Sequence, residues 1–168
     1  VDAANVTDNP MARLRMSSIA VAALIQREVG LDAIVQITTR DRNVLGLQSD
    51  LLGAAGLGLK ALLCLGGDPL KIGDYPQGKQ VSEVDVLGLL RMARGLNGGA
   101  DLAGNSIGSA TQFAIGCAAN PAALDLDVER DETKPPAPPP DPLKAPAAAA
   151  VAAKPAIPAP KPSAPMAS

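Results

Sequence analysis

A short segment from Gly66 to Pro69 has the residue types of a ligand-binding turn. Residues 61–66 carry no charge, which favours a strand buried on both faces. Gly66 and Gly67 let the backbone turn sharply and lie close to a bound group, and the proline ends the strand. Asp68 would then emerge at the carboxyl end of a buried strand, where α/β sheets bind ligands. An ordinary turn with a solvated aspartate fits the same residues equally well.

The composition of the chain argues against several other kinds of chemistry. Its 168 residues include no His, no Trp, two Cys and a formal net charge of −2. Without histidine, and with few thiols near acids, no metal site is predicted. The charge favours neither nucleic acid nor a membrane as partner, no apolar run could span a bilayer, and no signal peptide is recognisable, so we expect a cytoplasmic protein. Cys64 and Cys117 lie in apolar strand-like runs, which favours two buried reduced thiols over a disulfide.

Apolar runs alternate with helical patterns along the first 130 residues. The helical patterns begin at Ser17 or Ser18, at Asn43, and at a capping box formed by Ser82 and Asp85. The apolar runs predict strands near residues 33–38, 59–65 and 113–118. One helix separates each strand from the next, so the strands should be parallel neighbours in that order, joined by helical crossovers. The sequence therefore predicts an α/β fold.

The composition changes near residues 129–133. All 16 glycines lie before residue 131, whereas 12 of the 16 prolines lie after it. Residues 131–168 are rich in Pro, Ala and Lys, and they contain no aromatic residue and no periodic apolar face. We predict that residues 1–130 form one domain and that residues 131–168 form a disordered tail.

Taken together, five segments resemble the methylenetetrahydrofolate reductase family: TDNPMARLRMSS, ITTRDRN, LQSDLLGAAGLGLK, LCLGGDP and CAANP. The chain is most similar to the branch that is fused with homocysteine methyltransferase domains, and RDRN followed by LQSDLLGAAGLG is the most specific part of the resemblance. The resemblance implies a (β/α)8 TIM barrel that binds FAD at the carboxyl ends of its strands. It also implies that a hydride passes from NADH or NADPH, through the flavin, to 5,10-methylenetetrahydrofolate, which becomes 5-methyltetrahydrofolate.

The resemblance also implies which positions contact the flavin, namely Thr7, Gln36, Leu65, Gly66, Gly67, Asp68, Ala119 and Asn120. Asp68 would lie near the flavin ring, where its negative charge opposes the anionic reduced flavin and influences the redox potential rather than transferring a proton. The family commonly has histidine at the position of Gln36, threonine or arginine at that of Gly66, and cysteine at that of Thr39. Two possible donors to the cofactor are therefore lost.

The resemblance covers about half of the family's barrel, from residue 1 to residue 130. The family's first strand, with the glutamate that donates a proton, is expected before Val1, and its folate-binding strands are expected after Arg130. We therefore expect a partial barrel that lacks full catalysis on its own. Its open sheet edges favour a homo-oligomer or a complementary chain or domain.

Two other functions remain open from the sequence. The first is a non-catalytic half-barrel that serves as an interaction module and pairs with a complementary chain. The second is a doubly wound nucleotide-binding domain, which is less favoured because no GxGxxG motif follows a predicted strand. A separate chain that supplies the missing strands would distinguish the module from a reductase fragment.

Overall fold

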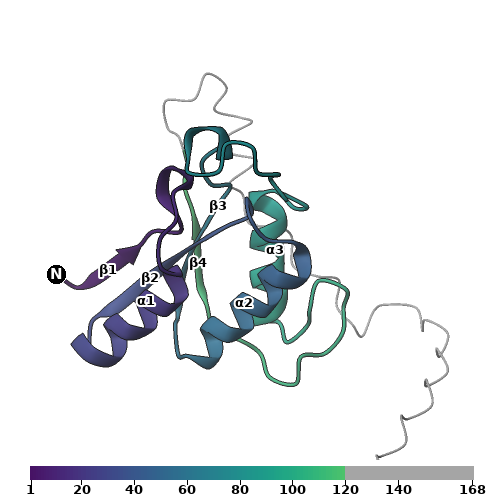
Figure 1. Ribbon diagram of the computed structural model, residues 1–168. Helices are drawn as coiled ribbons and strands as arrows, with labels where there is room; N and C mark the ends of the chain where they lie inside the picture. The colour runs from purple at the N-terminus through teal and green to yellow at the C-terminus, as the bar shows by residue number, and fades with distance from the viewer. Residues whose placement is uncertain (120–168) are drawn as a thin grey trace, which may run out of the picture. The chain divides into compact units, whose positions relative to one another are not determined.

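The described part of the chain, residues 1–119 of a computed structural model, is built on one sheet of four parallel strands (Figure 1). The strands are β1 (Ala3–Val6), β2 (Asp32–Thr38), β3 (Ala61–Leu65) and β4 (Ala114–Cys117). They lie side by side in chain order, and each neighbouring pair is parallel. The predicted order of parallel strands is therefore confirmed. The tail predicted for residues 131–168 lies outside the described residues.

The strands are connected by α1 (Ser18–Leu24), which continues as the π-helical turn η2 (Ile25–Val29), and by α2 (Val44–Gly56) and α3 (Val86–Asn97). Two short 3-10 helices, η1 (Pro10–Ala12) and η3 (Leu70–Ile72), lie in the loops after β1 and β3. All three predicted helices are present. None of the helices in residues 1–119 is long and apolar enough to cross a bilayer.

The starts of α2 and α3 are set by side-chain caps, which bond N–H groups that have no partner within the helix. The side chain of Asn43 accepts a hydrogen bond from the N–H of Gly46 at 2.8 Å, as expected. Asp85 accepts one from the N–H of Gly88 at 2.7 Å. The capping box predicted for Ser82 and Asp85 is wrong, because Asp85 is itself the N-cap and Ser82 lies in the preceding loop with a φ of 36°.

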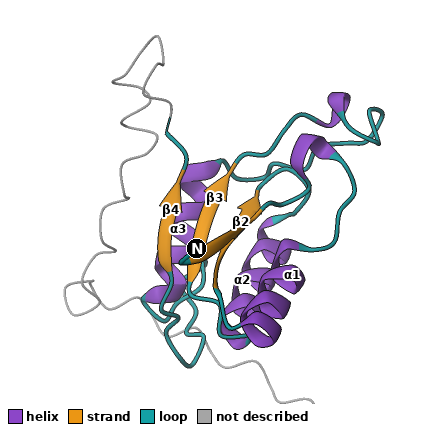
Figure 2. Ribbon diagram, turned by 90° about the vertical axis from the view of Figure 1, so that its left-hand side faces the viewer, coloured by secondary structure: helices purple, strands orange, loops and turns teal. Residues whose placement is uncertain are grey.

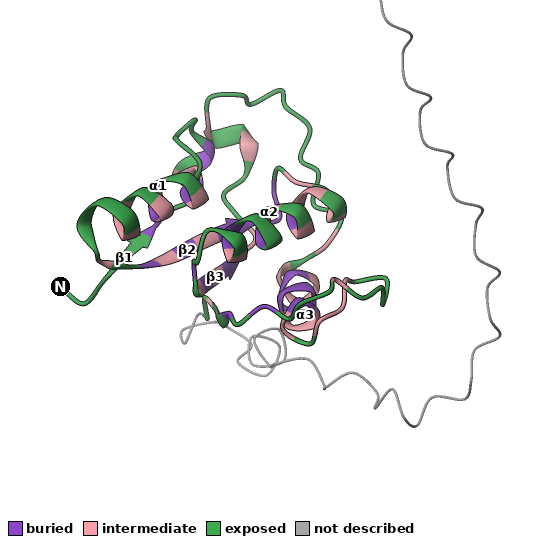
Figure 3. Cartoon of the chain, turned by 90° about the horizontal axis from the view of Figure 1, so that it is seen from below, coloured by how far each residue is buried: buried purple, intermediate pink, exposed green. Residues whose placement is uncertain are grey.

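The hydrophobic core lies on one face of the sheet. It combines alternate strand residues with one side of each helix, and its members include Val6, Val35, Ile37, Leu62, Cys64, Ala22, Leu47, Leu51, Leu89 and Leu96. Successive side chains of a strand point to opposite faces, so α1, α2 and α3 must all cover the same face. Figure 2 shows the helices flanking the sheet, and Figure 3 shows buried residues where helices and strands meet.

The other face of the sheet has no helix over it within residues 1–119. In β3, Leu62 and Cys64 are 2% and 0% exposed, whereas Leu63 between them is only half-buried. The prediction of a strand buried on both faces is therefore wrong for the described residues. Residues 61–66 carry no charge because the uncovered face of β3 also presents apolar side chains, such as Leu63, which are half-buried. A parallel sheet with helical crossovers packed on one face and an open second face fits a partial (β/α)8 barrel, as predicted.

The two cysteines are both free thiols, as predicted. Cys64 is fully buried, whereas Cys117 is only half-buried, so the expected burial is correct for Cys64 alone. Burial raises the pKa of the Cys64 thiol to about 12, with a smaller contribution from Cys117. Cys64 therefore stays protonated and serves as an apolar core residue.

Candidate functional site

A cavity of about 310 Å³ lies at the carboxyl ends of β1, β2 and β3. Its walls come from the loop after β1, the second half of β2 and the loop after β3. Parallel strands end at the same edge of a sheet, so residues far apart in the sequence meet there. The lining residues are Asp8, Pro10, Gln36, Thr38, Leu65, Gly66, Gly67 and Asp68.

The eight predicted flavin contacts are only partly brought together. Five of them line this cavity, namely Gln36, Leu65, Gly66, Gly67 and Asp68. Thr7 directly follows β1 and Ala119 follows β4, but both are exposed and neither is in the lining. Asn120 lies outside the described residues. The Gln36 amide donates a hydrogen bond to Oδ1 of Asn5 at 3.2 Å, which holds it on the open face of the sheet.

The Gly66–Gly67 turn places the loop after β3 directly against the end of β2. Gly67 has a φ of 86°, and a Cβ there would lie 3.1 Å from the Cβ atoms of Thr38 and Arg40. Any other residue would be both strained and crowded at this position. A second cavity of about 320 Å³ adjoins the same glycines and includes Thr39 and the loop before α3 in its lining. The glycine turn therefore forms part of the wall of both cavities.

Asp68 lies just beyond the carboxyl end of β3, as predicted, but one of its oxygens is already used. Its Oδ2 accepts a hydrogen bond from the N–H of Met11 at 2.6 Å. Asp74 holds the same loop by accepting a hydrogen bond from the N–H of Leu14 at 2.7 Å. Met11 and Ala12 have φ values of 56° and 52°, which are uncommon for L residues. The two carboxylates therefore restrain a strained segment beside the cavity.

A buried ion pair ties the loop after β1 to β2. The Asp8 side chain is 1% exposed, and its Oδ2 accepts hydrogen bonds from the backbone N–H and the Oγ1 of Thr38 at 3.0 and 2.9 Å. Arg42 donates to both oxygens of Asp8, at 2.6 and 3.2 Å, and to Asp50 at 2.8 Å. Burial alone would lower the pKa of Arg42, but its hydrogen bonds with Asp8 and Asp50 and their charges outweigh this effect and raise it. Asp8 therefore holds the loop in place.

Arg40 is a second buried cation at this end of the sheet, and its side chain is 1% exposed. Its hydrogen bond with Asp41 is the main reason why the pKa of its guanidinium is raised. Sequence reasoning used the RDRN motif only as a mark of the family and missed the structural role of Arg40 and Arg42. Two arginines directly after a buried strand were the available signal, because loops at this edge carry the binding groups in such folds.

The side chains around the cavity suit binding and orientation more than nucleophilic catalysis. They present an amide, a hydroxyl and a carboxylate, together with backbone that can approach a ligand closely at the glycines. Within residues 1–119, no group of three His, Cys, Asp or Glu residues could hold a metal ion.

A comparison with curated proteins found no match. A family model described as methylenetetrahydrofolate reductase matches residues 2–134, which is most of the 168 residues. Such a match supports an oxidoreductase that acts on folate-bound one-carbon units, in a family that is flavin-dependent in general. The partial barrel and the cavity at the carboxyl ends of its strands agree with that match, and the chain belongs to the methylenetetrahydrofolate reductase family.

Proposed function

We propose that this chain contributes the flavin-binding half of a reductase that converts 5,10-methylenetetrahydrofolate into 5-methyltetrahydrofolate, with FAD as cofactor and NADH or NADPH as electron donor. One observation carries the proposal. Gln36, Leu65 and the three residues from Gly66 to Asp68, which the resemblance assigns to the flavin, line one cavity although they come from two different strands and a loop.

The cavity and its lining fit the ring of a flavin. Its volume of about 310 Å³ is near the lower end of the 300–1,000 Å³ typical of small-molecule sites, so it suits the isoalloxazine ring rather than the whole dinucleotide. The half-buried Leu65 side chain offers an apolar surface, and the Gln36 amide offers hydrogen bonds to the ring edge. When bound, the flavin would supply the group that accepts a hydride and passes it on.

Asp68 would act on the flavin through its charge. Within residues 1–119, its Oδ1 accepts no hydrogen bond, while its Oδ2 is held by the N–H of Met11. A fixed carboxylate beside the ring disfavours the anionic reduced form, which makes that form a stronger reductant. The Met11 contact therefore orients the free oxygen for this role.

We further propose that the activity depends on a complementary chain or domain. Within residues 1–119, β1 and β4 each pair with a single neighbour, so both outer edges of the half-barrel are open. Asp8, Asp41 and Asp50, together with backbone carbonyls, already accept the hydrogen bonds of Arg40 and Arg42, which are then not free for a pyrophosphate. Gln36 and Gly66 supply no positive charge either, so two charge-assisted hydrogen bonds to FAD are missing. At about 1.5–3 kcal/mol each, their loss weakens the binding of FAD by roughly 10²–10⁴-fold.

The test is the visible absorption and fluorescence of the chain after addition of FAD. We expect the chain alone to be colourless and inactive. A fusion that completes the barrel, with a first strand that carries the glutamate and with the final strands, should bind FAD and reduce 5,10-methylenetetrahydrofolate. Stoichiometric flavin on the chain alone would contradict the need for completion, and no flavin on the folded fusion would contradict the cofactor assignment.

Two matched variants of the fusion locate the flavin. Asp68→Asn removes the charge from the carboxyl-end cavity, and we expect it to raise the reduction potential of the bound flavin. Lys60→Ala changes an exposed residue at the opposite end of the sheet, and it should leave the potential unchanged. Equal potentials in all three proteins would place the flavin away from Asp68.

A further inference from the structure

Arg40 connects three loops at the carboxyl end of the sheet. Its Nη1 donates hydrogen bonds to the carbonyl of Asn9, in the loop after β1, at 3.3 Å and to the carbonyl of Asp68, in the loop after β3, at 3.4 Å. Its own carbonyl accepts a hydrogen bond from the N–H of Val81, farther along the same loop after β3, at 2.9 Å. The third loop is its own, after β2. One buried residue therefore touches every loop that lines the two carboxyl-end cavities.

The two halves of the guanidinium have separate partners. Nε donates to the Asp41 carboxylate at 2.9 and 3.0 Å, and Nη2 donates to the same carboxylate at 2.6 Å. This bidentate pair compensates the charge and leaves Nη1 for the carbonyls of Asn9 and Asp68. A lysine could offer the charge but not this planar fork, because its donors all sit on one nitrogen. The geometry needs an arginine.

The loop that Arg40 holds also needs a restraint. Asn9, Met11 and Ala12 all have positive φ values, between 45° and 56°, in a region that residues with a side chain seldom adopt. Strained segments of this kind persist where their surroundings hold them in several places. Here Asp68 holds the N–H of Met11, and Arg40 holds both the Asn9 carbonyl and the backbone of Asp68 itself. Arg40 thus links the strained segment to the residue that anchors it.

We propose that Arg40 is a positioning residue that sets the separation of the β1 and β3 loops across the carboxyl-end cavity. It holds Asp68 and the glycine turn in the arrangement that receives the ligand. It acts through these residues and does not itself line the cavity. The nature of the ligand rests on the proposed function, whereas the contacts between the loops do not.

The first test is amide hydrogen exchange of the full chain. In Arg40→Lys, we expect the amide of Met11 to exchange at least about tenfold faster, while the core amides of Val35 and Leu62 keep their rates. Arg27→Lys is the matched control, because Arg27 also pairs with the next residue, Glu28, but is 72% exposed. The control should exchange like the unchanged chain at all three amides.

The second test measures FAD binding by flavin fluorescence in the completed barrel and in its Arg40→Lys and Arg27→Lys variants. Arg40→Lys should raise the dissociation constant at least about tenfold, because the ring then meets a mobile Asp68, and Arg27→Lys should leave it unchanged. If FAD binds to none of the proteins, the proposed function fails, but the exchange result still decides the role of Arg40.

Several outcomes would overturn the inference. Unchanged exchange at Met11 in Arg40→Lys would show that Arg40 does not hold the loops. Equal acceleration at Met11, Val35 and Leu62 would show a general role in stability instead. If Arg40→Lys does not fold, the variant Asp41→Asn is used instead. This variant keeps the arginine but removes the carboxylate that orients its guanidinium group. Asp41→Asn should then accelerate exchange at Met11 alone.

Discussion

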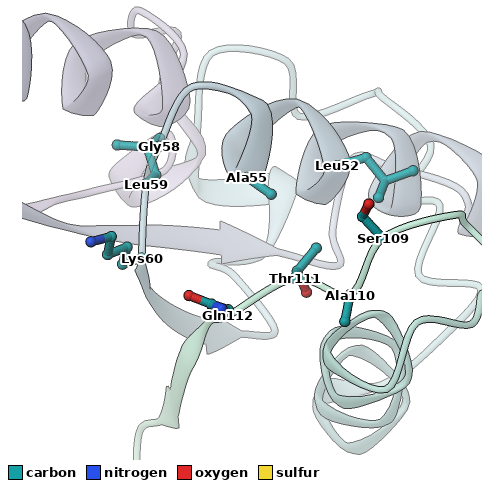
Figure 4. A pocket seen from close by; sticks show the side chains of 9 residues that line it. All are labelled: Leu52, Ala55, Gly58, Leu59, Lys60, Ser109, Ala110, Thr111 and Gln112. Carbon is teal, nitrogen blue, oxygen red and sulfur yellow. The ribbon is translucent and has the colours of Figure 1, made fainter.

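The two ends of the sheet carry cavities of similar size and very different surroundings. The amino-end cavity, of about 400 Å³, lies between α2 and the segment before β4 and is lined by Leu52, Ala55, Gly58, Leu59, Lys60, Ser109, Ala110, Thr111 and Gln112 (Figure 4). The carboxyl-end cavity is smaller, at about 310 Å³, but buried charges surround it. Of these two cavities, size alone would favour the amino end, whereas the proposed flavin site lies at the carboxyl end.

The polar groups at the amino end are not organised around the cavity. Within residues 1–119, the side chains of Lys60 and Gln112 are exposed and make no hydrogen bond, and Thr111 donates to Oδ1 of Asn97 at 2.7 Å. At the carboxyl end, Asp8 and Arg40 are each held by three or more hydrogen bonds. The two ends therefore differ in how firmly their polar groups are held, and the proposed site lies at the end where they are buried and fixed.

The largest effect should follow from breaking the buried ion pair at the carboxyl end. Asp8→Ala leaves Arg42 partly buried without its main partner, and this should lower the free energy of unfolding by about 3–5 kcal/mol. Asp50 is the other partner of Arg42, and its side chain is 42% exposed. Asp50→Ala should therefore lower the free energy of unfolding by less than about 1 kcal/mol. Urea unfolding of both variants measures the difference, and equal losses would show that burial of the pair does not matter.

A smaller effect should separate two glycines at opposite ends of the sheet. Both Gly67 and Gly58 have positive φ values, of 86° and 79°, but a Cβ at Gly58 would meet nothing within 4 Å. Gly58→Ala should therefore cost only backbone strain, about 1–2 kcal/mol, whereas Gly67→Ala adds crowding and should cost about 2–4 kcal/mol. Thermal unfolding compares them. If Gly67→Ala lowered the stability less than Gly58→Ala, the loop after β3 would adjust easily to the added methyl group, and the carboxyl end would not be rigid.

The smallest effect should come from Asp101, a half-buried charge in the loop between α3 and β4. The same loop also leads to the amino-end cavity. Hydrogen bonds from the side chain and the backbone N–H of Asn105 lower the pKa of Asp101. A lowered pKa in the folded state gives stability that is present above the unfolded pKa and is lost as the pH falls through the folded pKa. Asn105→Ala should raise the Asp101 pKa, which a carboxyl NMR titration would detect, with little change in stability at neutral pH. A large stability change would mean that this end also depends on organised charge.

Local sequence patterns determined the elements of this protein. Continuous apolar runs between helical patterns predicted β2, β3 and β4, and Asn43 predicted the start of α2. Such signals can be found in the sequence because strand periods, helix periods and caps depend on residues a few positions apart. The Gly66–Gly67 turn and the acid after it were also found from the sequence, because a strand end is recorded in consecutive residues. The same local reasoning placed the capping residue of α3 at Ser82 instead of Asp85, since both residues suit a cap.

Only the tertiary structure decided which charges surround the site and which face of the sheet stays open. The contact between Met11 and Asp68 joins residues 57 positions apart, and that between Arg40 and Asp68 joins residues 28 apart. The strand order, which the sequence did predict, shows which loops are neighbours but not which of their residues meet, because that depends on the path of each loop. The burial of β3 likewise depends on where the helices lie, and in residues 1–119 they cover one face of the sheet alone.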